Sequence, residues 1–460
     1  MNKNIFRAYD IRGIFEKDFT LNDACKIGQA YGSYLIKTYP QIKPQDLKVC
    51  VGKDGRTHGQ AIHQKFMEGV QLTGIQVFDI GFSFSPLLLF STCYGKFDGG
   101  VNITASHNPK EYNGFKLQKR KAHAIYGDEI QKIAEMIDQD DLTYATQTQK
   151  IEKISFWSEY KEKIKSISKN HHKKKIVVDA GNGITGMFVP ELFQEMGYEV
   201  VKLFCEVDGN FPNHEADPEN KDNLKDLQKK VLAEKALLGI AFDGDGDRVG
   251  IVDQEGTIFD ADHLLILLAK DLLKRHPQAK VVCTVTASSI VRDEIEKAGG
   301  KTIESKVGHS FVEDMMSKEK ALLGGESSGH LFFGENYYGY DDAVLAAVKI
   351  LEIVNRTPIP LKDHFKDLAK IYVSEEVKIY VPEEKKFLLM EKIKDYFTEK
   401  YQCSCIDGVK VFFDENSWAI CRASNTSPKI SFRCEAKEKK ELDKIFFKMN
   451  NVVLEIKKIY

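Results

Sequence analysis

The sequence predicts an α/β protein in which three related α/β domains precede a smaller α+β domain. Three observations lead to this fold class. The chain has 460 residues, about three times the length of an ordinary domain, and its hydrophobic fraction of 42% is ample for several cores. Three stretches repeat one order of apolar runs, turns and glycines. The segment after residue 370 follows a different order.

The repeated stretches span residues 47–81, 175–204 and 280–308. Each begins with a short apolar run, continues through a turn and a segment of helical length, and reaches a second apolar run after a glycine. This order is typical of a β-α-β unit, whose strands are usually parallel and whose crossover is right-handed. Because β-α-β units are common, chance similarity is the alternative to three related domains.

The tail of the chain changes to short strands and to helices rich in Lys and Glu. We expect strands near residues 377–381, 409–413, 417–421 and 430–434, and helices over residues 383–400 and 437–457. These elements predict an α+β domain. The charged helix faces are typical of solvated surfaces.

Charge and composition exclude several classes of protein. The 66 basic and 68 acidic residues give a net charge of −2, which argues against a nucleic-acid-binding protein. No apolar run is long enough to span a membrane, and the first residues do not resemble a secretion signal. The nine cysteines show no spacing typical of a disulfide framework, so we expect a reducing, cytoplasmic compartment.

The most informative run places Asp243, Asp245 and Asp247 at alternate positions, followed by Arg248, directly after an apolar run. Three carboxylates this close repel one another unless a cation neutralises them, and the intervening glycines let the backbone fold so that they converge. Such oxygen ligands suit Mg²⁺. An EF-hand is excluded, because its sixth and twelfth positions would be Arg248 and Gln254. A solvated acidic turn is the alternative.

A second run, residues 104–109, reads Thr-Ala-Ser-His-Asn-Pro after an expected strand. Small neighbours expose Ser106, and the proline prevents a helix from starting. A phosphorylated serine is a dianion that could complete a magnesium site with the three aspartates. An ordinary Ser/Asn turn is the alternative. Lys116 could stabilise phosphoryl charge or move a proton, or could simply be a surface lysine.

A third run, residues 324–330, reads Gly-Gly-Glu-Ser-Ser-Gly-His. Its Gly-x-Ser-x-Gly spacing resembles a hydrolase nucleophile elbow, but an elbow should open into a helix and the next segment is short and apolar. Glu326, Ser328 and His330 instead offer alternating acceptors and donors that suit sugar hydroxyls.

A fourth run, residues 422–428, reads Arg-Ala-Ser-Asn-Thr-Ser-Pro between two expected strands. A guanidinium, hydroxyls and exposed N–H groups can form a phosphate cradle, and a plain hairpin loop is the alternative. Residues 181–186 also fit a dinucleotide fingerprint, with Glu206 roughly in range. The other two repeats lack these glycines, so tight packing between strand and helix is the preferred interpretation.

Together and in this order, these runs resemble the α-D-phosphohexomutase family, most closely its phosphomannomutase/phosphoglucomutase branch. Residues 6–13 and 306–310 extend the resemblance over nearly the whole chain. The resemblance implies a heart-shaped arrangement of three α/β domains with mixed sheets and a fourth domain similar to the TATA-binding protein. One loop from each domain would meet in a central cleft. We place the domains at residues 1–148, 149–253, 254–368 and 369–460.

The resemblance also implies roles for single residues. Ser106 matches the family's phosphoserine. Together with Asp243, Asp245 and Asp247 it matches the family's Mg²⁺ site, and Arg248 matches the arginine beside the phosphoryl group. The residues matched to substrate binding or proton transfer are Tyr9, Arg12, Lys116, His309, Glu326, Ser328, His330, Arg422, Ser424, Asn425 and Thr426. Thr286 departs from the lysine that relatives often carry, which leaves that contact open, and Asn425 favours the hexose branch over the glucosamine branch.

The implied function is reversible exchange between hexose 1-phosphate and hexose 6-phosphate of mannose or glucose. Phosphorylated Ser106 would donate its phosphoryl group to the free hydroxyl, with hexose 1,6-bisphosphate as intermediate and activator. Mg²⁺ and Arg248 would neutralise the developing charge. Lys116, Arg12 and His330 are candidate bases. We expect a sugar-phosphate substrate, no nucleic-acid or membrane partner, and a monomer with a dimer as the alternative.

Four other functions stay open. They are a phosphoglucosamine mutase of the same family, a Mg²⁺-dependent phosphotransferase with Asp243 as an aspartyl nucleophile, an NAD-dependent oxidoreductase that uses the glycine run, and a non-catalytic sugar-phosphate sensor. The sequence does not choose between mannose and glucose.

Overall fold

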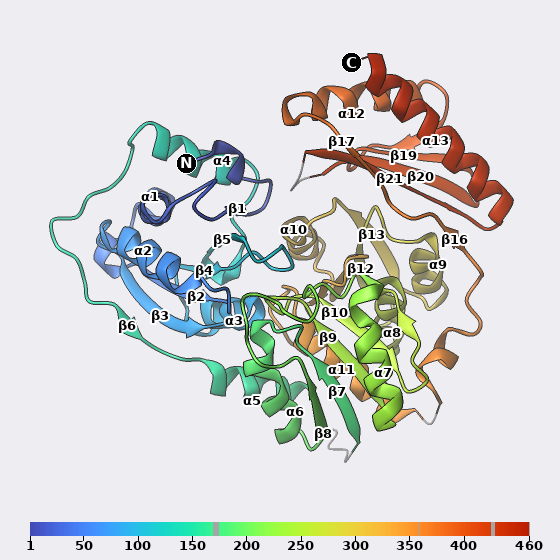
Figure 1. Cartoon of the computed structure of the whole chain (residues 1–460), viewed down its shortest axis with the longest axis horizontal. Helices are drawn as coiled ribbons and strands as arrows, with labels where there is room; N and C mark the ends of the chain where they lie inside the picture. The colour runs from blue at the N-terminus through green and yellow to red at the C-terminus, as the bar shows by residue number, and fades with distance from the viewer. Residues whose placement is uncertain (169–173, 358, 425–427, 460) are drawn as a thin grey trace.

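The computed structural model describes residues 1–168, 174–357, 359–424 and 428–459, and these form four units that each contain one sheet. The units follow one another around the molecule in chain order (Figure 1). The predicted fold class is confirmed: the first three units have mixed sheets with parallel β-α-β pairs, and the fourth sheet is antiparallel.

The first sheet has the strand order β1-β5-β4-β2-β3-β6. Its strands are β1 (Ile11–Ile14), β2 (Lys48–Lys53), β3 (Gln76–Phe82), β4 (Gly99–Ile103), β5 (Tyr112–Lys119) and β6 (Glu152–Lys153). The helices are α1 (Leu21–Thr38), α2 (Gly59–Gln71), α3 (Ser85–Tyr94) and α4 (Asp128–Asp138). Strand β2 is parallel to β3 and β4, and β5 returns antiparallel to β4.

The second sheet has the order β11-β10-β9-β7-β8. Its strands are β7 (Lys175–Asp179), β8 (Glu199–Leu203), β9 (Leu238–Phe242), β10 (Val249–Asp253) and β11 (Ile258–Phe259). The helices of this unit are α5 (Trp157–Ile167), α6 (Val189–Glu195) and α7 (Lys225–Glu234).

The third sheet has the order β13-β12-β14-β15. Its strands are β12 (Lys280–Thr284), β13 (Lys301–Ser305), β14 (Leu323–Gly325) and β15 (Leu331–Phe333). The helices are α8 (Ala261–Arg275), α9 (Ser289–Lys297), α10 (His309–Glu319) and α11 (Ala343–Arg356).

The three sheets share one arrangement that positions the loops with chemical character. Each has a central parallel pair, a third strand parallel to it, and a fourth strand that returns antiparallel through a hairpin. The three hairpin loops are residues 104–111, 243–248 and 326–330, which carry the serine, acidic and Gly-Glu-Ser-Ser-Gly-His runs. Because the arrangement repeats, the three runs occupy equivalent places in three related domains.

The fourth sheet runs β16-β21-β20-β19-β18, with β17 also paired to β21. Its strands are β16 (Tyr372–Val373), β17 (Val377–Tyr380), β18 (Gln402–Ser404), β19 (Val409–Asp414), β20 (Ser417–Ala423) and β21 (Lys429–Ala436). The helices are α12 (Glu383–Thr398) and α13 (Lys439–Ile459). Strand β18 was not predicted, because its three residues are too few to show an alternating pattern.

Apolar packing ties the first three units together more closely than the fourth. Helix α3 of the first unit, which is buried on nearly all sides, packs in one core cluster with α5, α8 and α11 of the next two units. The fourth unit has a core of its own, and a small cluster around Trp418, Ile420 and Val285 connects it to the third. Among the described residues, no helix has both the length and the apolar character needed to cross a membrane.

Candidate active site

A cleft of about 670 Å³ opens where loops of all four units meet. The predicted residues that line it are Tyr9, Arg12, Ser106, Lys116, Arg248, His309, Glu326, Ser328, His330, Arg422 and Ser424. Asp243, Asp245 and Asp247 are buried beside Ser106. Asn425 and Thr426 lie outside the described residues. The structure therefore brings together the parts of the predicted site that it describes.

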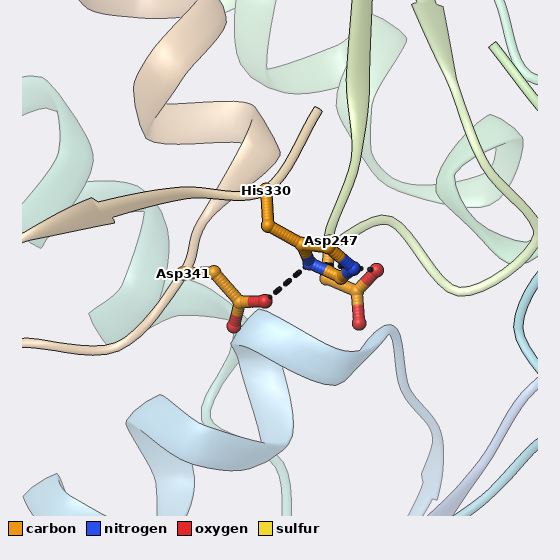
Figure 2. Close-up of side chains that lie close together, drawn as sticks. All are labelled: Asp247, His330 and Asp341. Atoms are coloured by element: carbon orange, nitrogen blue, oxygen red, sulfur yellow. Dashed lines mark hydrogen bonds and ion pairs between the residues drawn. The ribbon is translucent and has the colours of Figure 1, made fainter. Parts of the chain in front are cut away.

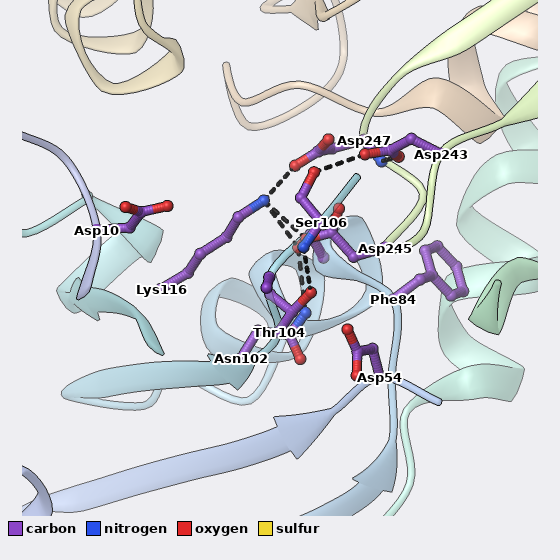
Figure 3. Close-up of polar contacts among 12 residues, drawn as sticks. Asp10, Asp54, Phe84, Asn102, Thr104, Ser106, Lys116, Asp243, Asp245 and Asp247 are labelled. Atoms are coloured by element: carbon purple, nitrogen blue, oxygen red, sulfur yellow. Dashed lines mark hydrogen bonds and ion pairs between the residues drawn. The ribbon is translucent and has the colours of Figure 1, made fainter. Parts of the chain in front are cut away.

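Ser106 occupies the hairpin loop between β4 and β5 in an unusual backbone conformation (Figure 3). Its φ of 51° lies in the left-handed region, which costs a non-glycine residue about 1–2 kcal/mol. Its N–H donates to Thr104 Oγ1 at 2.9 Å, and its hydroxyl donates to Asp243 Oδ2 at 2.7 Å. His107 Nδ1 lies 3.2 Å from the same hydroxyl. The loop thus directs the hydroxyl at the acidic run, which is more than a hundred residues away in sequence.

Gly244 allows the acidic loop to approach the serine loop this closely. A Cβ atom at Gly244 would lie 2.4 Å from the carbonyl oxygen of Ser106, where no side chain fits. Gly183 in turn packs against Gly244, because a Cβ there would lie 3.0 Å from the Gly244 carbonyl oxygen. The glycine run 181–186 therefore packs against the acidic loop at this junction, whereas the preferred interpretation of the sequence was tight packing between strand and helix.

The three aspartates present carboxylate oxygens within 4.8 Å of one another, and all three side chains are buried. Asp243 Oδ1 accepts from the backbone N–H of Asp247 at 3.0 Å and of Arg248 at 3.2 Å, so the hairpin itself orients this carboxylate. Asp245 Oδ2 accepts from the hydroxyl of Ser85 at 2.7 Å. Ser85 is the first residue of α3, so the first unit holds the acidic loop of the second from a helix N-terminus.

Among the described residues, Lys116 supplies the ammonium that contacts the three aspartates directly. Its Nζ lies 2.8 Å from Asp245 Oδ2 and also contacts Asp247 Oδ2 (Figure 3). Burial lowers the pKa of Lys116, but Asp245 and Asp247 outweigh burial and raise it. Burial raises the pKa of Asp245 and of Asp247. The neighbouring ammonium of Lys116 opposes this effect, and the pKa of each carboxyl ends below its usual value. Burial and the two neighbouring carboxylates raise the pKa of Asp243.

The donor set fits a divalent cation. Asp245 Oδ1 and Asp247 Oδ1 are buried and accept no hydrogen bond from any described residue, which is costly for carboxylate oxygens without a partner. Together with Asp243 Oδ2 and the hydroxyl of Ser106 they are hard oxygen ligands, the kind that Mg²⁺ prefers. The acidic triad can therefore hold a metal ion.

His330 lies beside the carboxylates of Asp341 and Asp247 (Figure 2), and its other ring nitrogen meets the guanidinium of Arg248. Its Nδ1 lies 2.6 Å from Asp341 Oδ2 and 3.6 Å from Asp247 Oδ1. Arg248 Nε donates to His330 Nε2 at 3.0 Å, so the ring proton belongs on Nδ1, where it is donated to Asp341. Backbone pairing between Arg248 and His330 joins the second and third hairpin loops at this point. Sequence reasoning missed Asp341, whose relation to His330 depends on the turn after β15.

Asp342, the next residue, is fixed by side chains of two units. Its carboxylate accepts from the hydroxyls of Tyr160 at 2.9 Å and Tyr337 at 2.6 Å and from the Leu345 N–H at 2.9 Å. Burial raises the pKa of Asp342 to about 6, although these hydrogen bonds favour the charged form. Asp342 thus anchors the start of α11 directly beside the partner of His330.

The raised pKa of Asp342 makes the free energy of unfolding of the protein depend on pH. The folded-state pKa of about 6 exceeds the unfolded value, so the free energy of unfolding should fall as pH rises from about 4 to about 6. A shift of about two units corresponds to about 2–3 kcal/mol. Asp342→Asn should remove this loss, so its stability relative to the parent should rise across that range in urea titrations. The exposed Asp443→Asn is the control, and a pH-independent difference for Asp342→Asn would contradict the prediction.

Residues of the third and first units line another part of the cleft. Glu326 Oε2 accepts from the Gly308 N–H at 3.1 Å, and the Tyr9 ring meets the His309 ring edge-on at 5.3 Å. Burial, followed by the charge of Lys116, lowers the pKa of His309 to about 3, so this imidazole is neutral at physiological pH. Arg12 pairs with Asp10 and donates to Asn108 Oδ1 at 2.7 Å.

The fourth unit supplies cations to the opposite side. Arg422 Nε donates to Asp407 Oδ2 at 3.0 Å, and the same oxygen accepts from the Val307 N–H of the third unit at 3.1 Å. Further residues of this unit that line the cleft, and that the sequence did not single out, are Glu376, Lys378, Lys429, Ser431 and Arg433. Glu376 directly precedes β17, and the other four residues lie on the neighbouring strands β17 and β21, which no local motif marks.

Two remaining predictions concern Thr286 and Ser327. Thr286 lines the cleft, and its hydroxyl lies 3.0 Å from the hydroxyl of Thr284, so this position is part of the site. Ser327 sits in the β14–β15 hairpin turn and donates to Asp262 at 3.2 Å. No helix follows it, so the nucleophile-elbow interpretation fails as the sequence indicated.

Comparison with known families gives matches to all four domains of one family, in order. Phosphoglucomutase/phosphomannomutase alpha/beta/alpha domain I matches residues 3–144, domain II residues 155–256, domain III residues 260–372, and the C-terminal domain residues 376–451.

Individual proteins agree with the family match. A phosphomannomutase/phosphoglucomutase of Pseudomonas syringae pv. tomato is 39% identical over 442 residues, which cover 96% of this chain and 93% of the relative. A phosphoglucomutase of Neisseria gonorrhoeae is 34% identical and covers 97% of this chain and 95% of its own. Among solved structures, a phosphoglucomutase/phosphomannomutase family protein of Burkholderia thailandensis superposes with a TM-score of 0.90 at 32% identity, over 99% and 98% of the two chains.

Proposed function

The chain belongs to the phosphoglucomutase/phosphomannomutase family and is a phosphohexomutase, and we propose that it works through phosphorylated Ser106 and a hexose 1,6-bisphosphate. One observation carries this mechanism. The hydroxyl of Ser106 donates to Asp243 at 2.7 Å, so a phosphoryl group on that oxygen would lie against a triad of carboxylates able to hold a metal. The second unit supplies the triad and the first unit the hydroxyl.

In the proposed reaction, the bond between Ser106 Oγ and phosphorus breaks as a bond forms from phosphorus to the free sugar hydroxyl. The resulting hexose 1,6-bisphosphate reverses its orientation within the cleft and returns its other phosphoryl group to Ser106. Arg248, which lines the cleft, neutralises charge on the transferring oxygens. When bound by the triad and Ser106, Mg²⁺ supplies further charge neutralisation.

His330 is the proposed acceptor of the sugar proton. Lys116 is engaged by two carboxylates that keep it protonated, and Arg12 is a guanidinium paired with Asp10. His330 Nε2 instead carries a lone pair, and Asp341 fixes the ring from the other nitrogen. Rotation of Arg248 toward a phosphoryl group would free Nε2 for the sugar hydroxyl.

Replacing His330 should slow turnover without loss of binding. We expect His330→Asn to lower kcat on the order of 10²–10⁴-fold with KM little changed, because general-base catalysis contributes about that much. Steady-state kinetics with an unchanged thermal transition would check this. Asp341→Asn, which leaves the imidazole in place, should cost less. Equal kcat for the parent and His330→Asn would assign the proton to another group.

The other proposed alternatives are disfavoured by relatives and geometry. The two curated relatives described above carry the names phosphomannomutase/phosphoglucomutase and phosphoglucomutase. Asp243 is a poor aspartyl nucleophile, because one oxygen accepts from Ser106 and the other from two backbone N–H groups. The glycine run packs against Gly244 and against the Cys205 carbonyl, where a Cβ at Gly186 would lie at 2.2 Å.

Substrate choice can be tested by direct competition. We propose mannose or glucose phosphates as substrates and hexose 1,6-bisphosphate as activator. The enzyme is given an equimolar mixture of mannose 1-phosphate, glucose 1-phosphate and glucosamine 1-phosphate with Mg²⁺ and glucose 1,6-bisphosphate, and the products are followed by ³¹P NMR. Mannose 6-phosphate, glucose 6-phosphate or both should appear fastest. Fastest conversion of glucosamine 1-phosphate would overturn the proposed substrate class.

Arg422 is proposed to hold the phosphate that does not react. Arg422→Ala should raise KM for the sugar phosphate about 10–100-fold, since a hydrogen bond to a charged group contributes about 1.5–3 kcal/mol. Arg422→Lys should give a smaller rise, because a lysine keeps the charge but not the fork. Asp407→Asn, which disturbs the contact with the third unit but keeps the guanidinium, is the control. An unchanged KM in Arg422→Ala would contradict the cradle.

We also propose a monomer in the reducing cytoplasm. All nine cysteines are described and none forms a disulfide, which is consistent with such a compartment. Light scattering of purified protein would distinguish the monomer from a dimer.

A further inference from the structure

Arg56 is a buried guanidinium that the mechanism above does not use. It follows β2 in the turn Asp54-Gly55-Arg56, and its side chain is 1% exposed. Its terminal nitrogens donate to four backbone carbonyl oxygens: Nη2 to Ser106 at 2.8 Å and Asn108 at 2.6 Å, and Nη1 to Pro109 at 2.8 Å and Tyr112 at 3.0 Å. All four carbonyls belong to the loop that carries Ser106 or to the start of β5, so one side chain ties the loop together.

Asp54 holds the same loop from the other side of Ser106. Its carboxylate lies 3.3 Å from Arg56 Nε and accepts a hydrogen bond from the Thr104 hydroxyl. That hydroxyl oxygen accepts from the N–H of Ser106 at 2.9 Å. The ion pair of Asp54 and Arg56 thus reaches both the N–H and the C=O of Ser106, the residue whose φ is left-handed.

The contacts on the Ser106 carbonyl leave it little freedom. Arg56 donates to this oxygen from one side, and Gly244 of the acidic loop approaches it closely enough that a Cβ there would lie at 2.4 Å. A residue held at its N–H, its C=O and its hydroxyl has one position available. Phosphoryl transfer requires such a fixed position, because displacement of a reacting atom by about 1 Å can cost on the order of 10²-fold in rate.

We propose that Arg56, supported by Asp54, is a positioning residue that holds Ser106 in the orientation required for phosphoryl transfer. The proposal rests on the phosphoserine mechanism above and adds to it a residue outside the cleft lining. Arg56 acts through backbone carbonyls and does not touch the substrate. Losing it should therefore slow transfer in both directions while leaving sugar-phosphate binding, which uses other loops, nearly unchanged.

The test compares Arg56→Lys and Arg56→Met with the control Lys53→Met. A lysine keeps the charge but cannot span four carbonyls. Lys53 is also a buried cation, 4% exposed, and lies one residue before Asp54, but its ammonium faces the Phe82 ring at 3.2 Å rather than the serine loop. Two assays are used. The first measures kcat and KM for glucose 1-phosphate, and the second measures the rate at which glucose 1,6-bisphosphate phosphorylates dephosphorylated protein, followed by intact mass.

We expect both Arg56 variants to lose about 10²-fold in kcat and in the phosphorylation rate together, with KM within about threefold of the parent. Lys53→Met should match the parent in both rates. Thr104→Val removes the hydroxyl that connects Asp54 with the Ser106 N–H and leaves the Arg56 contacts in place. It should show a smaller loss in both rates, and it replaces the Arg56 variants in the test if those do not fold.

Rates within threefold of the parent for folded Arg56 variants, or for Thr104→Val where those do not fold, would overturn the proposal. So would an equal loss in Lys53→Met, because it would indicate general destabilisation of the first unit. Failure of the phosphoserine mechanism is a separate outcome: it would appear as a parent protein that turns over substrate without ever carrying phosphate on Ser106.

Discussion

Purified protein is expected to carry one phosphate on Ser106, and Ser106→Ala should carry none and lose nearly all mutase activity. The loss should be on the order of 10⁴-fold or more, the scale seen when a covalent nucleophile is removed. Alanine leaves the loop contacts of Arg56 and Gly244 in place, because both involve the backbone of residue 106. Intact mass, peptide mapping and kcat on the same preparation would check the prediction.

The control is a matched serine elsewhere in the same unit. Ser91→Ala removes a buried hydroxyl that donates to the Leu87 carbonyl within α3, far from phosphoryl chemistry, and should retain both phosphate and activity. The phosphate should survive acid, since phosphoserine is stable where an aspartyl phosphate hydrolyses. A fully active Ser106→Ala enzyme would end the phosphoserine mechanism, and an acid-labile phosphate would return attention to Asp243.

The sequence predicted the parts of the site that local motifs encode. The three predicted β-α-β stretches appear as β2–β3, β7–β8 and β12–β13. They could be predicted because an apolar run and the glycine that follows a helix can be recognised within a short stretch of sequence. The acidic, serine and sugar-binding runs were found for the same reason. Their equivalence was not predicted: each is the hairpin loop after the third of the parallel strands of its sheet, and that follows from pairing order rather than from any one segment.

Residues that act on the site from a distance escaped sequence reasoning. Ser85 donates to Asp245 across 160 positions, and Arg56 reaches Ser106 across 50. Neither lies in a run with chemical character, since Ser85 merely begins a helix and Arg56 ends a turn. Asp341 was missed because nothing local connects it with His330. Such contacts depend on how strands and units pack, and a single sequence carries no local signal for that packing.

The acidic triad leads to the second large effect, which concerns stability rather than rate. Three buried carboxylates converge within 4.8 Å, and the Lys116 ammonium contacts two of them. Removing one partner of a buried ion pair typically costs about 3–5 kcal/mol, because the remaining charge is left without compensation. In EDTA, Lys116→Met should therefore lower the thermal transition of the protein markedly, while Lys119→Met on the same strand, paired with partly exposed Glu129, should lower it little.

Mg²⁺ should then stabilise Lys116→Met more than it stabilises the parent. In the parent, a bound cation and the ammonium share the same carboxylates, so part of the cation's effect is already supplied by Lys116. In the variant the triad has no ammonium in contact, and the cation removes a larger repulsion. Scanning calorimetry with EDTA and with saturating Mg²⁺ measures both gains independently of activity. Equal gains in the parent and in Lys116→Met would mean that the metal and the lysine do not act on the same carboxylates, and the proposed magnesium site would have to lie elsewhere.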